Sequence, residues 1–125
     1  MKKDPVLTVF LAWILPGAGH WYVGQRWKAV LFCFFVVLLF TLGVLLTDGG
    51  CVDLTRHRYA AILQAADGIP MLIAAIATKG ASEPAASKTN DFGMLLTLVA
   101  GALNVLIISD ALYRTSPDAE GARIE

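Results

Sequence analysis

Charge is scarce in this sequence. Charged residues make up 16% of the 125 residues, and ten cations balance ten anions, whereas soluble domains carry about 25% charged residues. The sequence has no basic tract and no nucleic-acid-binding motif, so nothing indicates a nucleic-acid partner. The low charge content argues against a water-soluble protein and predicts that the lipid bilayer surrounds the chain.

Residues able to carry out chemistry are equally few. Of the two cysteines, Cys33 lies in an apolar run and Cys51 in a polar loop, so we expect no disulfide between them. The spacing of His20, Cys51 and His57 matches no metal-ligand pattern. The three glycines of residues 17–24 do not form a nucleotide-binding G-x-G-x-x-G, and no nucleophile stands near a base. We therefore predict no enzymatic activity, no metal and no cofactor.

Long apolar runs are what the chain does contain. Residues 29–47 and 92–109 form uncharged runs of 19 and 18 residues, and about 18 apolar residues are enough to span the bilayer as a helix. Two further segments are hydrophobic but interrupted. We predict an all-α membrane protein, a small bundle of three or four hydrophobic segments in one membrane domain, residues 1–113. The segments lie at about residues 5–15, 28–47, 59–78 and 92–113, and a polar tail follows at 114–125.

The first and third segments are irregular. The first has only ten residues before Pro16, so it could continue through the glycines to Gly24 and cross as a broken helix, dip in and return, or lie in the interface. The third carries Asp67, Gly68 and Pro70 near its middle, and because Pro70 removes a backbone donor we expect a kink near residues 67–70. If all four segments cross, six cations lie on the side of the N-terminus and four on the other; if the first only dips, the division is again six to four. Both versions favour a cytoplasmic N-terminus, but they place the C-terminus on different sides.

An acidic residue within a membrane segment is the sharpest single feature. Asp67 lies near the centre of its segment, where a charge costs at least about 2.5 kcal/mol. Gln64 shares its helix face, and Asn104 lies at a similar depth in the fourth segment. We predict a buried polar contact among these three residues. The favoured interpretation is helix–helix packing with a protonated Asp67 as hydrogen-bond donor; the alternative is a proton or ion relay.

Small and charged residues also mark the fourth segment. Gly93, Thr97 and Gly101 follow at intervals of four, which lets another helix approach closely. The alanine-rich third segment is the expected neighbour, and another molecule is the alternative. Asp110 is expected to form an interfacial ion pair with Arg114 at i,i+4, or to pair with Arg56 or Arg58.

The stretch LPGAGHWYVGQRWK between the first two segments reads as a helix-turn motif. Its proline ends a helix and its glycines let the chain bend, while its aromatic and basic side chains suit the headgroup layer. We assign these roles to Pro16, Gly17, Gly19, Trp21, Tyr22, Gly24, Arg26, Trp27 and Lys28. His20 has no clear role; we expect it to cap or pair with a nearby backbone group, or with Asp91.

Two stretches resemble a known family. LAWILPGAGHWYVGQRWKAVLF (residues 11–32) and TLVAGALNVLIISDALY (residues 97–113) are similar to a family of small bacterial membrane proteins of unknown function with the pattern Pro-Gly-x-Gly-His-aromatic-aromatic-x-Gly. A remote similarity also exists to the two-transmembrane domain family, although Ala29 stands where glycine is common and TDGGCVDL lacks that family's turn. The resemblance implies placement in a membrane and an accessory or regulatory role.

Together these features predict a non-enzymatic, multi-pass protein of the bacterial inner membrane. We expect a structural or accessory subunit that packs against other membrane helices or against itself. The alternative is a small oligomeric transporter or ion-conducting subunit that uses Asp67, Gln64 and Asn104.

Overall fold

The computed structural model describes residues 3–50, 58–79, 88–116 and 121. Within these ranges the chain forms six helices and no strand. In chain order the helices are α1 (Pro5–Ile14), α2 (Ala18–Val23), α3 (Arg26–Leu46), α4 (Arg58–Ala65), α5 (Ile69–Ala77) and α6 (Lys88–Tyr113). Two of them, α3 and α6, are long and apolar enough to cross a membrane, and the other four are short.

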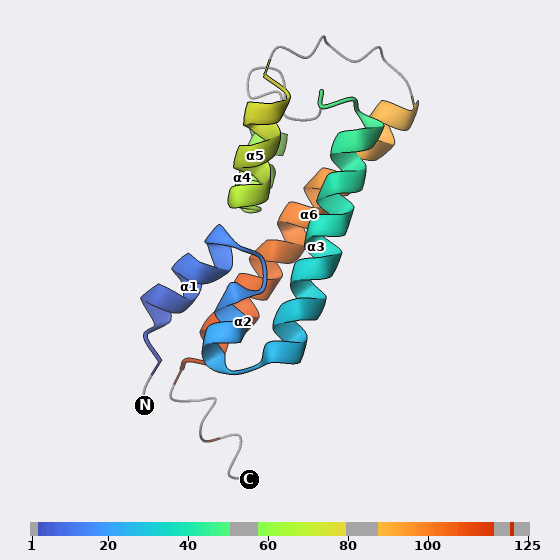
Figure 1. Cartoon of the computed structure of the whole chain (residues 1–125). Coiled ribbons are helices and arrows are strands. Elements are labelled where there is room, and N and C mark those ends of the chain that lie inside the picture. The colour runs from blue at the N-terminus through green and yellow to red at the C-terminus, as the bar shows by residue number, and fades with distance from the viewer. Residues whose placement is uncertain (1–2, 51–57, 80–87, 117–120, 122–125) are drawn as a thin grey trace.

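The two long helices form the centre of the molecule. They lie side by side and run in opposite directions (Figure 1). With 21 and 26 residues, they are about 32 and 39 Å long at 1.5 Å per residue, enough for a hydrocarbon core of about 30 Å. Val36 and Phe40 of α3 pack against Ala100 and Ile107 of α6 to form the main apolar core.

The first segment is a helical hairpin and does not run the length of the long helices. Pro16 has no N–H and disfavours helical geometry at the residue before it, so α1 stops and Leu15 is extended (φ −133°, ψ 120°). Gly17 then adopts φ +88°, a conformation that glycine tolerates best, and the chain reverses into α2. Gly19 of α2 packs directly on Ala12 of α1. The segment therefore returns to the end of the molecule where it began (Figure 1).

The third segment is a second hairpin. Gly68 has φ +62° and separates α4 from α5. Gln64 of α4 is bonded to Thr97 near the middle of α6, whereas Thr78, directly after α5, lies against Gly49 at the end of α3. Because α5 turns back in this way, the expected single kinked helix is in fact two separate helices.

Of the alternatives left open for the first segment, the structure shows the one in which the chain turns back, and the third segment, expected to be a single kinked helix, turns back as well. The break at Pro16 is present, but it reverses the chain instead of bending it. With 10, 6, 8 and 9 residues, the four short helices are each about 15 Å long or less at 1.5 Å per residue. Each can reach only about halfway along α3 or α6.

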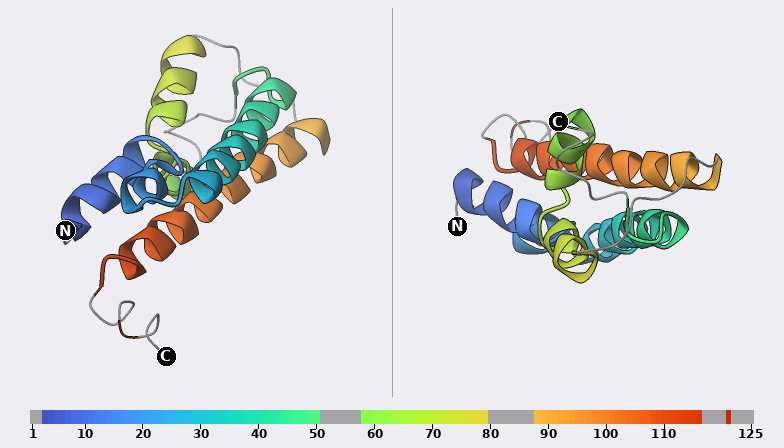
Figure 2. Two further views of the ribbon diagram at one scale, coloured as in Figure 1. Left: turned by 60° about the horizontal axis from the view of Figure 1, so that its bottom comes forward. Right: turned by 90° about the horizontal axis from the view of Figure 1, so that it is seen from above.

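The two hairpins approach the middle of the molecule from opposite ends (Figure 1). Both α1 and α4 pack against α6. Figure 2 shows α4 beside α6, while α5 stands apart from it on the side of α3. The start of α1 and the end of α6 lie at the same end of the molecule. Of the predicted tail, residues 117–120 and 122–125 lie outside the described residues.

Candidate functional site

The tips of the two hairpins meet near the middle of the molecule. We call this contact, made by residues 13–17 and 65–69, the hairpin seam. The indole Nε1–H of Trp13 donates a hydrogen bond of 3.0 Å to the carbonyl of Ala65. A Cβ on Gly68 would collide with the Trp13 carbonyl oxygen. The two backbones therefore approach so closely that only glycine fits at position 68.

Side chains of α6 hold the end of α4 in place. Gln64 Nε2 donates to Thr97 Oγ1 over 2.8 Å, and Asn104 Nδ2 donates to the Ala66 carbonyl over 2.5 Å. A Cβ on Gly101 would collide with the Leu63 carbonyl, so α4 and α6 are in backbone contact. The last carbonyls of a helix have no partner within it. Here the Ala65 carbonyl, the last of α4, accepts from Trp13 as well as from the Gly68 N–H, and the Ala66 carbonyl just after the helix accepts from Asn104.

Asp67 lies within this arrangement without a partner of its own. Its side chain is fully buried, and neither carboxyl oxygen has a hydrogen-bond partner in the described part of the chain. The Oδ1 atom of Asn104 is buried and unpartnered as well. The expected three-way contact is therefore replaced by two separate hydrogen bonds. Gln64 binds a threonine, and Asn104 binds the backbone one residue before Asp67.

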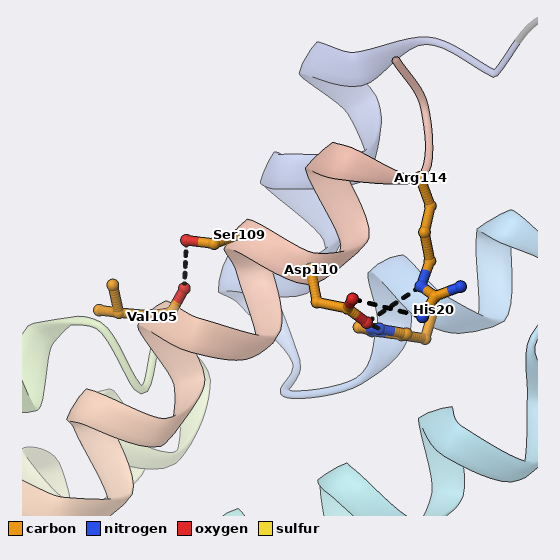
Figure 3. Close-up of polar contacts among 5 residues, drawn as sticks. All are labelled: His20, Val105, Ser109, Asp110 and Arg114. Atoms are coloured by element: carbon orange, nitrogen blue, oxygen red, sulfur yellow. Dashed lines mark hydrogen bonds and ion pairs between the residues drawn. The ribbon is translucent and has the colours of Figure 1, made fainter. Parts of the chain in front are cut away.

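A second polar cluster lies near the end of α6. His20 is fully buried, and its Nε2 lies 2.7 Å from Oδ2 of Asp110. Arg114 donates to the same carboxylate through Nε at 3.0 Å and Nη2 at 3.3 Å, as Figure 3 shows. The partner of His20 is thus Asp110 and not Asp91, because α2 turns back to the end of the molecule where α6 ends. Asp91 lies in the first turn of α6, at the opposite end.

Arg58, an alternative partner of Asp110, lies away from it. Arg58 begins α4, and α4 packs on the earlier half of α6 through Gln64 and Thr97. Arg56, the other alternative partner, lies outside the described residues, as do Cys51 and His57.

The aromatic and basic residues of the helix-turn motif gather at one end of the first hairpin. Trp21 and Trp27 are 56% and 90% exposed. The guanidinium of Arg26 lies 5.8 Å from the Trp21 ring, and Lys3 Nζ lies 4.6 Å from the ring of Tyr22. Such pairs of amphipathic rings and cations are typical of the headgroup layer. Lys28 is exposed nearby, whereas Pro16 and Gly17 are buried.

The small residues of α6 contact two different helices. A Cβ on Gly43 would lie 2.5 Å from Cγ2 of Thr97 and 2.6 Å from the Gly93 carbonyl. Gly93 therefore lies against α3 and Gly101 against α4, while Thr97 contacts both, through Gly43 of α3 and Gln64 of α4. The third segment, the expected neighbour of this ladder, contacts it at Thr97 and Gly101, whereas Gly93 packs on α3.

The "Family of unknown function (DUF6677)" matches residues 7–122, a range that includes both hairpins and both long helices. The chain belongs to this family. The expectation of an uncharacterised family is confirmed at this level, and the DUF6677 match does not assign a role to any residue. No curated protein and no solved structure matches the chain.

Proposed function

We propose that this DUF6677 protein is a non-enzymatic, multi-pass protein of the bacterial inner membrane that serves as a structural or accessory subunit. The observation that carries the proposal is the hairpin seam. Its backbone is not helical at the depth where α3 and α6 are halfway through their length. Lipid offers no hydrogen bonds, so irregular backbone at that depth needs cover from protein or water.

One side of the seam is open in the single chain. Trp13, Leu15 and Ile69 are 44%, 43% and 41% exposed. The neighbouring helix α5 buries only Ala74 among its nine residues. A helix from another membrane protein, or from a second copy, would cover the seam and α5 together. This surface supports a role in assembly with other membrane helices.

The orientation belongs to the same proposal. The described residues place four cations at the end where α1 begins and three at the other end. The first group is Lys3, Arg26, Lys28 and Arg114, and the second is Arg58, Lys79 and Lys88. By the positive-inside rule, we place the N-terminus and the end of α6 in the cytoplasm.

Photo-crosslinking in native membranes tests the accessory role. A photoreactive amino acid replaces Leu15 or Ile69 at the seam, and Leu42 on α3 serves as the control because its exposure, 43%, equals that of Leu15. We expect discrete protein adducts from the two seam positions and only lipid adducts from Leu42. Equal adducts from all three positions, or purification in native lipid as a lone monomer, would contradict the proposal.

A second candidate function rests on Asp67. A small oligomeric transporter or ion-conducting subunit would use Asp67, Gln64 and Asn104, and the complete burial of an unpartnered carboxyl group favours it. Ionisable residues inside membranes usually face a pathway or a partner. In this case water reaches position 67, so a cysteine introduced by Asp67→Cys reacts with a polar, membrane-impermeant thiol reagent. A site that stays unreactive from both sides argues for the accessory role alone.

A further inference from the structure

The hydrogen bonds at the seam leave a surplus of acceptors. The carboxyl oxygens of Asp67 and Oδ1 of Asn104 are three buried oxygens without a donor. The donors closest in the fold are already engaged: Trp13 binds one carbonyl, the Asn104 amide binds another, and Gln64 binds Thr97. Burying polar groups without partners costs free energy, so the seam has the composition of a site that accepts a positively charged ligand.

The helix ends add to this imbalance. Both α1 and α4 end at the seam with their carbonyl ends, which carry partial negative charge. The amino end of α5 also begins there and offsets part of the effect. The side chains of α1 and α6 that bind the backbone beside Asp67 are Trp13 and Asn104, both neutral. The ion pairs among the described residues are those of Asp110, and none involves Asp67.

We propose that Asp67 and Asn104 form a binding site for one small monovalent cation, H⁺ or Na⁺, at the hairpin seam. A single carboxylate balances a single positive charge, whereas divalent cations prefer a larger set of oxygen ligands. Discontinuous helices that meet in the middle of a membrane use carbonyl ends and unwound backbone for such cations. The inference rests on the second candidate function, for which it names the ligand, and it is independent of the accessory role.

Carbodiimide labelling of the purified full-length protein in lipid nanodiscs tests the site. A hydrophobic carbodiimide adds to a protonated carboxyl group, and the adduct is located by mass spectrometry. At pH values above the pKa of the Asp67 carboxyl group, we expect the rate of labelling to fall about tenfold for each pH unit, because the protonated fraction falls in the same proportion. Asp67→Asn removes the label, and Asp67→Glu, which keeps a carboxyl group, retains it. Asp110, held by His20 and Arg114, is the internal control and stays largely unlabelled.

Changing the salt in the labelling assay distinguishes Na⁺ from H⁺ as the bound cation. Labelling that slows when Na⁺ replaces K⁺ at constant pH and ionic strength identifies Na⁺ as the ligand, and Asn104→Ala should then weaken this protection. Labelling that follows pH but ignores Na⁺ identifies H⁺. Two results would overturn the proposal. In the first, the labelling of Asp67 changes with neither pH nor Na⁺; in the second, Asp67 is labelled in unfolded protein but at no pH in folded protein.

Partner binding is measured separately. Asp67→Asn should leave the photo-crosslinks from Leu15 unchanged, because this side chain faces the buried interior. If carbodiimide labelling of Asp67 depends on neither pH nor Na⁺ while the crosslinks from Leu15 form, the cation site and the second candidate function are wrong and the accessory role stands. If the chain with Asp67 intact forms no protein crosslinks from Leu15, the accessory role alone is wrong.

Discussion

Replacing Gly68 with alanine tests whether the two hairpins really meet. The substitution has two costs. Position 68 has φ +62° and ψ −121°, and an L-residue held in so sparsely populated a region costs about 1–3 kcal/mol. The new Cβ would also collide with the Trp13 carbonyl, so the seam must open and the hydrogen bond from Trp13 to Ala65 is lost, at about 0.5–1.5 kcal/mol.

Gly24→Ala is the matched control. Gly24 also has positive φ, +96°, but a Cβ there meets nothing within 4 Å. Both variants put an L-residue at positive φ, but Gly24 lies in the left-handed helical region (ψ 6°) and Gly68 lies outside it (ψ −121°). Gly68→Ala therefore adds the collision and a larger backbone strain. We expect the free energy of unfolding to fall by about 1–3 kcal/mol more for Gly68→Ala than for Gly24→Ala. Reversible denaturation in detergent, followed by tryptophan fluorescence, measures both values. Equal destabilisation by the two variants would refute the close approach of the hairpins.

Three further predictions concern contacts made by α6. Gln64→Leu and Thr97→Val together should show a coupling free energy of about 0.6 kcal/mol, typical of hydrogen bonds between membrane helices, and a double-mutant cycle with no coupling would contradict their 2.8 Å contact. Gly43→Leu should prevent α3 from packing on α6 and lower the yield of folded protein in a thermal-stability screen, whereas normal stability would contradict the crossing. Asp110→Asn should cost about 1 kcal/mol, because the carboxylate forms charge-assisted hydrogen bonds but is 40% exposed, and solvent screens such pairs. Ser109→Ala should cost nearly nothing, because its hydroxyl binds only the Val105 carbonyl of its own helix (Figure 3), and equal losses in the two variants would count against the His20–Asp110–Arg114 cluster.

Local features were predictable from the sequence because their causes are local. The two long helices follow from uncharged runs of 19 and 18 residues. The break after Ile14 follows from the chemistry of Pro16. Asp67 and Asn104 were placed at similar depth by counting residues, and the structure puts Asn104 against the carbonyl next to Asp67.

The direction of the chain after each break was not predictable in the same way. A segment of about ten apolar residues before a break reaches half of a bilayer, whether the chain then continues or returns. The reversal depends on contacts that are distant in sequence, such as the indole of Trp13 on Ala65. The pairing of His20 with Asp110 depends on the same reversal and joins residues 90 positions apart. The positions of His20 and Asp110 within their own segments do not indicate that the two residues pair.

The topology of the two hairpins can be mapped directly with single cysteines. In a cysteine-free background, Lys3→Cys, Gln25→Cys and Ser116→Cys probe the end where α1 begins, and Gly50→Cys and Lys79→Cys probe the other end. Labelling with a membrane-impermeant thiol reagent, in intact cells and in inverted vesicles, reports the side of each position. We predict that 3, 25 and 116 share one side and that 50 and 79 share the opposite side. If 3 and 25 lie on opposite sides, the first segment crosses the membrane, and if 50 and 79 do, the third segment crosses it. Either result would show that the two-hairpin structure is wrong.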